Sequence, residues 1–276
     1  MKQVIIQLNN VSYSIGSENL SLNSSKSVEI LSNISLKIYK KEILGICGES
    51  GGGKTTLIKL IAGIISPVKG EMKVDHKISI KKNRTNKIQI LFQNSSDLLN
   101  PLRKVKDVID EIIELSENKN VDMEKEKVRL FSMLGIASAL ENRRGNELSG
   151  GERQRIALAR LLATKPRILI LDEPFSAQDV ISQLNFLKIL KRINGEMKIT
   201  ILCVSHDLNL LKKLVDRVVV LQNGRIVETA ITSKLFKSPK HSYTKFLLRA
   251  EEFSLTEDEI HSYNPNKTSD EKIYSK

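Results

Sequence analysis

Short, mostly apolar runs stand out along the chain at 43–47, 88–92, 167–171 and 199–204. Strands that are buried on both faces of a parallel sheet read as such continuous apolar runs. The stretch 54–65 instead repeats apolar residues at helical spacing, so a helix should follow shortly after the first run. Strands alternating with helices in this way predict an α/β core.

The N-terminal part and the middle of the chain have different patterns. Ile and Val alternate with polar residues at 4–11 and 27–47, which predicts short strands. From residue 94 to about 160 the strand patterns stop and helical patterns dominate, which we interpret as a helical insertion in the α/β core. The helices predicted there cover 105–115, 123–134 and 151–162.

The C-terminal part ends in a segment of different composition. Two short stretches at 217–221 and 225–229 flank Asn223-Gly224, a dipeptide typical of a β-hairpin turn. Residues 251–276 are acidic and poor in large apolar side chains, so we expect a loosely held tail. Because the sequence has no internal repeat, we predict one domain at 4–250 followed by this tail.

Composition and charge narrow the classes of protein. The net charge of the chain is +12, and no apolar run approaches the roughly 18 residues of a membrane helix. A cytoplasmic protein is therefore expected, with any membrane connection made through a partner. Cys47 and Cys203 fall in predicted buried strands and indicate no disulfide framework. Without Trp, and with 4% aromatic residues, the chain has few side chains for stacking bases, and we expect no nucleic-acid partner.

The most informative local motif lies between the first apolar run and the helix that follows. Residues 48–55 match the pattern Gly-x4-Gly-Lys-Ser/Thr, whose backbone N–H groups and helix N-terminus bind phosphates. Lys54 can reach the terminal phosphates of a triphosphate, and the Thr55 hydroxyl is placed to ligate Mg²⁺. The predicted nucleotide-binding residues of this motif are Gly48, Glu49, Ser50, Gly51, Gly52, Gly53, Lys54, Thr55 and Thr56.

An acidic pair ends the apolar run at 167–171. Ligands of open α/β sheets bind at the carboxyl ends of the strands, where Asp172 and Glu173 should lie. Asp172 would hold Mg²⁺ through water, whereas Glu173 is the candidate to polarise a water molecule that attacks the terminal phosphate.

A third segment, Leu148-Ser-Gly-Gly-Glu152, precedes this acidic pair by about twenty residues. Together the three segments resemble the ATP-binding cassette (ABC) ATPases. The resemblance implies an α/β fold: a P-loop NTPase (RecA-like) core with an antiparallel β subdomain and an inserted α-helical subdomain. It also implies that ATP and Mg²⁺ are the cofactors and that two cassettes pair head to tail. Residues of the third segment would then bind the ATP of the opposite cassette, and they are Ser149, Gly150, Gly151 and Glu152.

The resemblance assigns roles to further residues. Gln93 matches the glutamine that senses Mg²⁺ and the membrane partner, and His206 matches the switch histidine at the terminal phosphate. The catalytic residues implied are thus Lys54, Glu173 and His206. Where the family stacks an aromatic ring on adenine this chain has Ile15, with Tyr13 on the same strand face as the candidate replacement. Gln178, in the crossing loop, and Glu152 also depart from the commonest family residues.

Two stretches resemble the importers of peptides and nickel within this family. One runs from Gln93 to Val105 and includes Asn100-Pro101, and the other includes Pro239, His241 and Tyr243-Thr244. The resemblance implies an ATPase subunit that lies peripherally on the cytoplasmic face of the cell membrane. Its partners would be two permeases, a second ATPase, identical or different, and indirectly an external substrate-binding protein. The short tail slightly favours nickel or metal chelates over peptides as the transported substrate.

The sequence also allows two other interpretations. A soluble ABC ATPase uncoupled from transport would act on DNA or ribosomes, but Lys54 and Asp172 are too close in sequence for a long coiled-coil insertion. A binding-only cassette is disfavoured because Lys54, Glu173 and His206 are all present.

Overall fold

The computed structural model describes residues 2–16, 27–75, 78, 87–93, 99–116, 122–176 and 178–251. Its larger sheet has the strand order β5-β6-β7-β3-β8-β9. Neighbouring strands pair in parallel, except β8 and β9, which form the predicted antiparallel hairpin. The strands are β3 (Ile43–Gly48), β5 (Ile88–Leu91), β6 (Ile168–Asp172), β7 (Thr200–Val204), β8 (Arg217–Gln222) and β9 (Arg225–Ile231).

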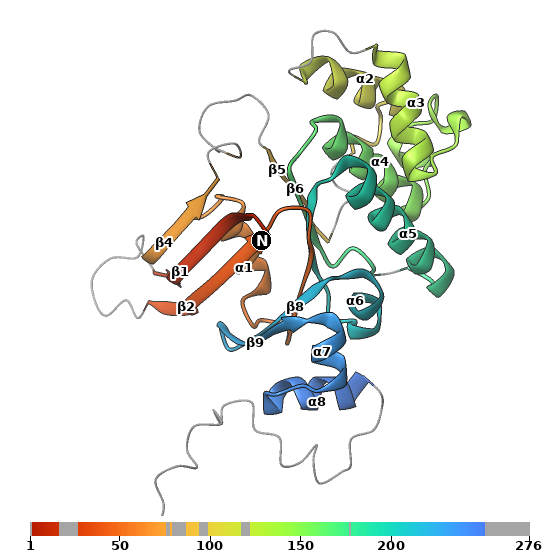
Figure 1. The fold of residues 1–276 in the computed structure, drawn as a ribbon. Coiled ribbons are helices and arrows are strands. Elements are labelled where there is room, and N and C mark those ends of the chain that lie inside the picture. The colour runs from red at the N-terminus through yellow and green to blue at the C-terminus, as the bar shows by residue number, and fades with distance from the viewer. Residues whose placement is uncertain are drawn as a thin grey trace, which may run out of the picture.

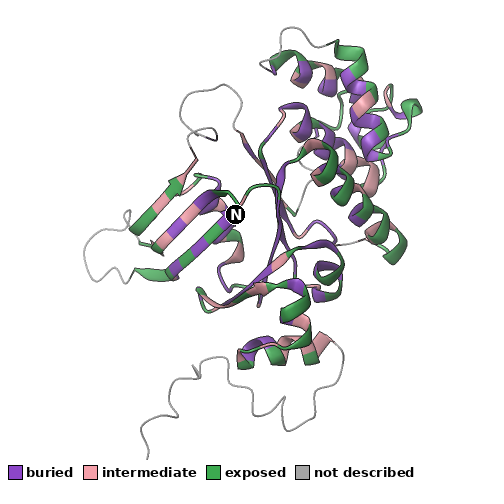
Figure 2. Ribbon diagram, in the orientation of Figure 1, coloured by how far each residue is buried: buried purple, intermediate pink, exposed green. Residues whose placement is uncertain are grey.

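The central strands of this sheet are buried on both faces, as their continuous apolar runs predict. In β6, Leu169 and Leu171 pack into one hydrophobic cluster, whereas Ile168 and Ile170 pack into a second. Figure 2 shows this burial along the central strands. The sheet therefore separates two cores, and the site must lie at its edge.

A smaller antiparallel sheet covers one face together with the first helix (Figure 1). It consists of β2 (Val28–Tyr39), β1 (Val4–Ile15) and β4 (Lys69–Val74), in that order. The predicted strand region 27–47 is thus divided between β2 and β3. A turn separates the two strands, and Lys41 in this turn has a left-handed φ of 65°.

The first helix, α1 (Lys54–Ile61), is shorter than the predicted 54–65. Gly63 has a φ of 72°, and the N–H groups of Gly63 and Ile64 donate to the carbonyls of Leu60 and Lys59 at 2.9 Å each. These bonds form a Schellman motif, which ends the helix before residue 65.

The other face of the larger sheet is covered by helices (Figure 1). Between β5 and β6 the chain forms α2 (Val105–Leu115), α3 (Met123–Leu134) and α4 (Gly150–Ala163). These are the three helices predicted for this region, and they pack on one another. Short 3-10 turns lie at Ser138–Leu140 and Gly145–Glu147. Several elements were not predicted: β4, α5 (Val180–Met197), α6 (Leu208–Leu214) and α7 (Thr232–Lys237).

The described chain ends in α8 (Ser242–Glu251). Glu251 therefore belongs to a helix and not to the predicted tail, and residues 252–276 lie outside the described part. Within the described residues, none of the helices combines the length and the apolar character that a membrane span requires.

Candidate functional site

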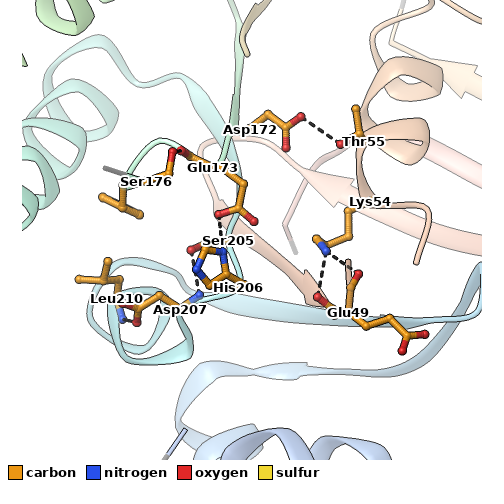
Figure 3. Close-up of polar contacts among 12 residues, drawn as sticks. Glu49, Lys54, Thr55, Asp172, Glu173, Ser176, Ser205, His206, Asp207 and Leu210 are labelled. Atoms are coloured by element: carbon orange, nitrogen blue, oxygen red, sulfur yellow. Dashed lines mark hydrogen bonds and ion pairs between the residues drawn. The ribbon is translucent and has the colours of Figure 1, made fainter. Parts of the chain in front are cut away.

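Adjacent parallel strands bring the predicted phosphate and acidic motifs together. β6, β7 and β3 are neighbours in the sheet, so their carboxyl ends lie at the same edge. Lys54 begins α1 directly after the loop that follows β3, and Asp172 ends β6 with Glu173 next to it. The loop after β7 carries His206. Figure 3 shows these side chains facing one another. The sheet topology alone thus assembles residues that are far apart in the sequence.

The phosphate loop is held tightly against its neighbours at two glycines. A Cβ on Gly48, whose φ is 147°, would lie 2.0 Å from the carbonyl oxygen of Leu221 in β8. A Cβ on Gly53, whose φ is 94°, would lie 2.9 Å from Leu31 Cδ2 in β2. Both positive φ values favour glycine, and at Gly48 the backbone oxygen also leaves no room for a Cβ.

Lys54 lies across this loop at the start of α1. Its Nζ donates to the carbonyl oxygens of Gly48 at 2.9 Å and Glu49 at 2.7 Å. The turn of the β8–β9 hairpin supports the loop from below, since the Gly224 N–H donates to Gly52 O at 3.2 Å. A positive charge, a curled backbone and a helix N-terminus converge here, which is the arrangement that binds phosphate groups.

Two of the three residues predicted to bind Mg²⁺, Thr55 and Asp172, are in direct contact. The Thr55 hydroxyl donates to Asp172 Oδ2 at 3.1 Å, and Asp172 is 7% exposed. Burial raises the pKa of the Asp172 carboxyl above its usual range, while the Thr55 hydrogen bond and the charge of Lys54 oppose that rise. A buried carboxylate beside a hydroxyl fits a hard divalent cation, whose positive charge would offset the negative charge of Asp172.

The predicted base and the predicted switch histidine are paired. Glu173 Oε2 lies 2.9 Å from His206 Nδ1. Glu173 adopts a left-handed φ of 49°, which is unusual for a residue with a side chain. Its N–H donates to Val204 O at 3.0 Å, and its carbonyl accepts from the Ser176 hydroxyl at 2.9 Å. Such strain is typical of a functional position that the surrounding structure holds in place.

Sequence reasoning missed the residue that supports the loop after this acidic pair. Buried Gln154, in α4, donates its amide to the carbonyl oxygen of Pro174 at 2.6 Å. The amide of Gln178 donates to the same carbonyl at 3.2 Å and also to Gln154 Oε1. A polar residue among the buried apolar residues of α4 was the available signal, because buried amides require partners.

Other predicted site residues lie outside this cluster. Ser149 and Glu152 form a capping box at the start of α4, where Glu152 N–H donates to Ser149 Oγ at 3.3 Å and Ser149 N–H donates to Glu152 Oε2 at 2.7 Å. The adjacent Gly150 is exposed. Gln93 is exposed directly after β5, and half-buried Tyr13 lies on β1 opposite Leu31.

Comparison with known proteins assigns the chain and its fold to a family. A family model described as ABC transporter matches residues 31–176, and the chain belongs to this family. The chain is therefore an ABC ATPase that binds ATP, and the predicted fold class is confirmed.

Individual relatives cover most of the chain. It is 34% identical to the oligopeptide transport ATP-binding protein OppF of Streptococcus mutans, over 90% of this chain and 82% of the relative. It is also 34% identical to the dipeptide transport ATP-binding protein DppF of Haemophilus influenzae, over 81% of this chain and 70% of the relative. A solved dimeric ABC cassette, MJ0796 in a post-hydrolysis state with ADP and Pi, matches with a TM-score of 0.69 and 26% identity, over 83% of this chain and 99% of that one.

Proposed function

We propose that this chain is the ATP-hydrolysing subunit of an importer that carries peptides across the cytoplasmic membrane. The observation that carries the proposal is the convergence of Lys54, the Thr55–Asp172 pair and the Glu173–His206 pair at one sheet edge. The similarity to two peptide-transport ATP-binding proteins supports the transported class. A soluble ABC ATPase uncoupled from transport is the less favoured alternative.

The phosphate loop would bind the ATP triphosphate. Its backbone N–H groups and Lys54 supply positive charge, and Lys54 would exchange its contacts with Gly48 and Glu49 for phosphate oxygens. Thr55 and Asp172 fit Mg²⁺ because both supply oxygen ligands, and Gln93 would complete the set. Bound there, Mg²⁺ would neutralise phosphate charge.

Hydrolysis would depend on the Glu173–His206 pair. Glu173 accepts a hydrogen bond from water and orients it toward the terminal phosphate, so its carboxylate must be ionised. His206 Nδ1, at 2.9 Å, holds this carboxylate in position and would contact the terminal phosphate itself. The left-handed backbone at Glu173, held by hydrogen bonds to Val204 and Ser176, would keep the carboxylate pointed toward the site.

A dimer would complete each site. Ser149, Gly150, Gly151 and Glu152 would bind the ATP of the opposite cassette, and Tyr13 would stack on adenine. The dimeric form of the similar MJ0796 cassette supports this arrangement. Closing the dimer around two ATP molecules would move α2, α3 and α4 and with them the permeases. The second ATPase is identical or different, and an external binding protein delivers the substrate to the permeases at the cytoplasmic membrane.

The transported substrate needs an experiment that separates peptides from nickel. The sequence leans slightly toward nickel, whereas the names of both relatives favour peptides. Uptake of a labelled peptide and of labelled nickel would be measured in cells that lack this protein and carry either the wild type or Glu173→Gln. Loss of peptide uptake alone is expected. Loss of nickel uptake alone would reassign the substrate, and two unchanged uptakes would contradict the importer proposal.

A further inference from the structure

The C-terminal helix reaches the phosphate loop through one hydroxyl group. The Glu49 N–H donates to the Tyr243 hydroxyl oxygen at 2.8 Å, although the two residues are 194 positions apart. Tyr243 is 3% exposed. On its other side, Glu49 offers its carbonyl oxygen to Lys54 Nζ at 2.7 Å. The same residue is therefore held by α8 and holds the lysine that should bind phosphate.

The start of α8 is itself anchored, so the hydroxyl is fixed before any ligand arrives. The carboxylate of Glu228, in β9, accepts from the N–H groups of Lys240 and His241 at 3.0 Å each. The N–H of Tyr243 donates to His241 Nδ1 at 3.2 Å, and the Tyr243 ring packs in the larger hydrophobic cluster. Because the ring and the backbone are both constrained, the Tyr243 hydroxyl has little freedom to leave Glu49.

The other end of α8 lies beside the loop between β7 and α6, which carries His206 and is called the histidine loop below. Glu251 Oε1 accepts from the Asn209 side chain at 3.3 Å, and burial together with nearby Asp207 raises the pKa of Glu251. A cavity of about 360 Å³ lies between α8, the phosphate loop and His206, with Leu247 among its lining residues. The helix thus touches both loops that carry catalytic groups.

We propose that Tyr243 is a positioning residue for ATP binding, and that α8 braces the phosphate loop against the histidine loop. The hydroxyl fixes the Glu49 peptide, so the phosphate loop keeps its curled form and Lys54 keeps its place when phosphate enters. A loop that is already ordered loses less entropy on binding, which raises affinity. The inference rests on the proposed nucleotide site, since it assigns Tyr243 a role only if ATP binds there.

The test compares variants of the full chain in titrations with a fluorescent ATP analogue and Mg²⁺. Tyr243→Phe keeps the buried ring and removes one neutral hydrogen bond, so affinity should fall roughly two- to tenfold. Tyr39→Phe is the matched control, because it removes a hydroxyl from a tyrosine whose ring packs against Arg217 in another part of the fold. Its affinity should equal that of the wild type.

Two further variants separate the possible failures. Lys54→Ala tests the nucleotide site itself. If this variant binds the ATP analogue as tightly as the wild type, the proposed nucleotide site is refuted, whatever the result for Tyr243→Phe. If Lys54→Ala is weak but Tyr243→Phe matches the wild type, the brace alone is refuted. Glu228→Gln loosens the start of α8 without altering Tyr243 and should also lower affinity, by less than Tyr243→Phe.

Amide hydrogen exchange distinguishes positioning from general packing. In Tyr243→Phe, exchange should accelerate in the peptide that contains Glu49 and stay unchanged in β6 and β7. Faster exchange throughout the core together with weaker ATP binding would assign Tyr243 a general packing role and overturn the proposal.

Discussion

Buried Gln154 supports the loop that carries Glu173, the predicted base, without touching Glu173 itself. Its amide donates to Pro174 O at 2.6 Å, one residue after Glu173. Replacing it with Ala leaves that buried carbonyl with only the longer bond from Gln178. We expect Gln154→Ala to cost roughly 1–3 kcal/mol of stability. ATP hydrolysis should slow more than ATP affinity falls, because the residue displaced would be Glu173, the predicted base.

This expectation is checked by denaturant unfolding and by phosphate release at saturating ATP. Gln183→Ala is a suitable control, since the Gln183 side chain donates to Phe175 O at 3.2 Å farther from the acidic pair. Equal hydrolysis rates in the wild type and Gln154→Ala would show that the loop keeps its form without Gln154.

Gly48 tests the steric part of the phosphate site. A Cβ at this position would lie 2.0 Å from a backbone oxygen of β8, so the loop must move. Gly48→Ala should cost roughly 1–3 kcal/mol, as overpacking does, and should weaken ATP binding. Gly195→Ala is the control, because a Cβ there meets open space within α5 and should stabilise the helix by up to about 1 kcal/mol. Thermal unfolding and ATP titration of both variants decide the matter, and a Gly48→Ala protein as stable as the control would contradict the steric argument.

The site residues that the sequence predicts differ physically from those it misses. The glycines, Lys54 and Thr55 are neighbours in sequence, and the chemistry of phosphate binding fixes their spacing. Asp172 and Glu173 are recognisable because a buried apolar strand delivers them. Tyr243 bonds to Glu49 across 194 positions, and nothing in either local sequence indicates that contact. Contacts of this kind depend on how complete elements pack.

At the scale of elements, α8 is attached to β9 through a carboxylate, which makes its docking sensitive to pH. Partial burial acts to raise the pKa of Glu228, but hydrogen bonds from the N–H groups of His241 and Lys240 outweigh it and hold that pKa below its usual value. The carboxyl is thus a stronger acid in the folded protein than in the unfolded chain. Its contribution to stability is present above the ordinary carboxyl range and is lost as pH falls through the lowered pKa.

The difference in melting temperature between the wild type and Glu228→Gln should therefore depend on pH. The wild type should be the more stable at neutral pH, and the difference should shrink in acid as Glu228 is protonated. Glu71→Gln, on the exposed face of β4, should show a much smaller difference at neutral pH because the Glu71–Lys73 pair is solvent-exposed. A difference that stays constant from neutral pH into the acid range would show that Glu228 acts through packing and not through its charge.

The elements that were not predicted lack a clear periodicity of apolar residues in their sequences. In α5 the buried residues Phe186, Leu187, Leu190 and Ile193 lie on one face, but Val180 and Ile181 are apolar and exposed. This extra apolar surface blurs the helical repeat. β4 contains no fully buried residue, so its alternation carries little signal. The central strands were predictable because burial on both faces leaves only apolar residues.

At the scale of the whole molecule, the parallel sheet places the two groups of predicted site residues in different parts of the chain. The strand ends present Lys54, Glu173 and His206 at one edge, whereas Ser149 and its neighbours cap a helix in the insertion. Exposed Val180 and Ile181 at the start of α5 add apolar surface in the segment that follows Glu173. Both features fit a surface that a second cassette covers when ATP binds.

The pairing of two cassettes can be tested at Glu173, the predicted base. Glu173→Gln keeps the size and the hydrogen-bonding capacity of the side chain but cannot accept a proton, so hydrolysis should fall roughly 10²- to 10⁴-fold. ATP should still bind, and the dimer that it closes should persist because hydrolysis no longer reopens it.

Size-exclusion chromatography with ATP and Mg²⁺ should show a lasting dimer for Glu173→Gln and a transient one for the wild type. Lys54→Ala should stay monomeric, because it lacks the charge that holds the phosphates. Normal turnover in Glu173→Gln would exclude Glu173 as the base, and a monomer that hydrolyses ATP at the wild-type rate would exclude the completed dimer as the working unit.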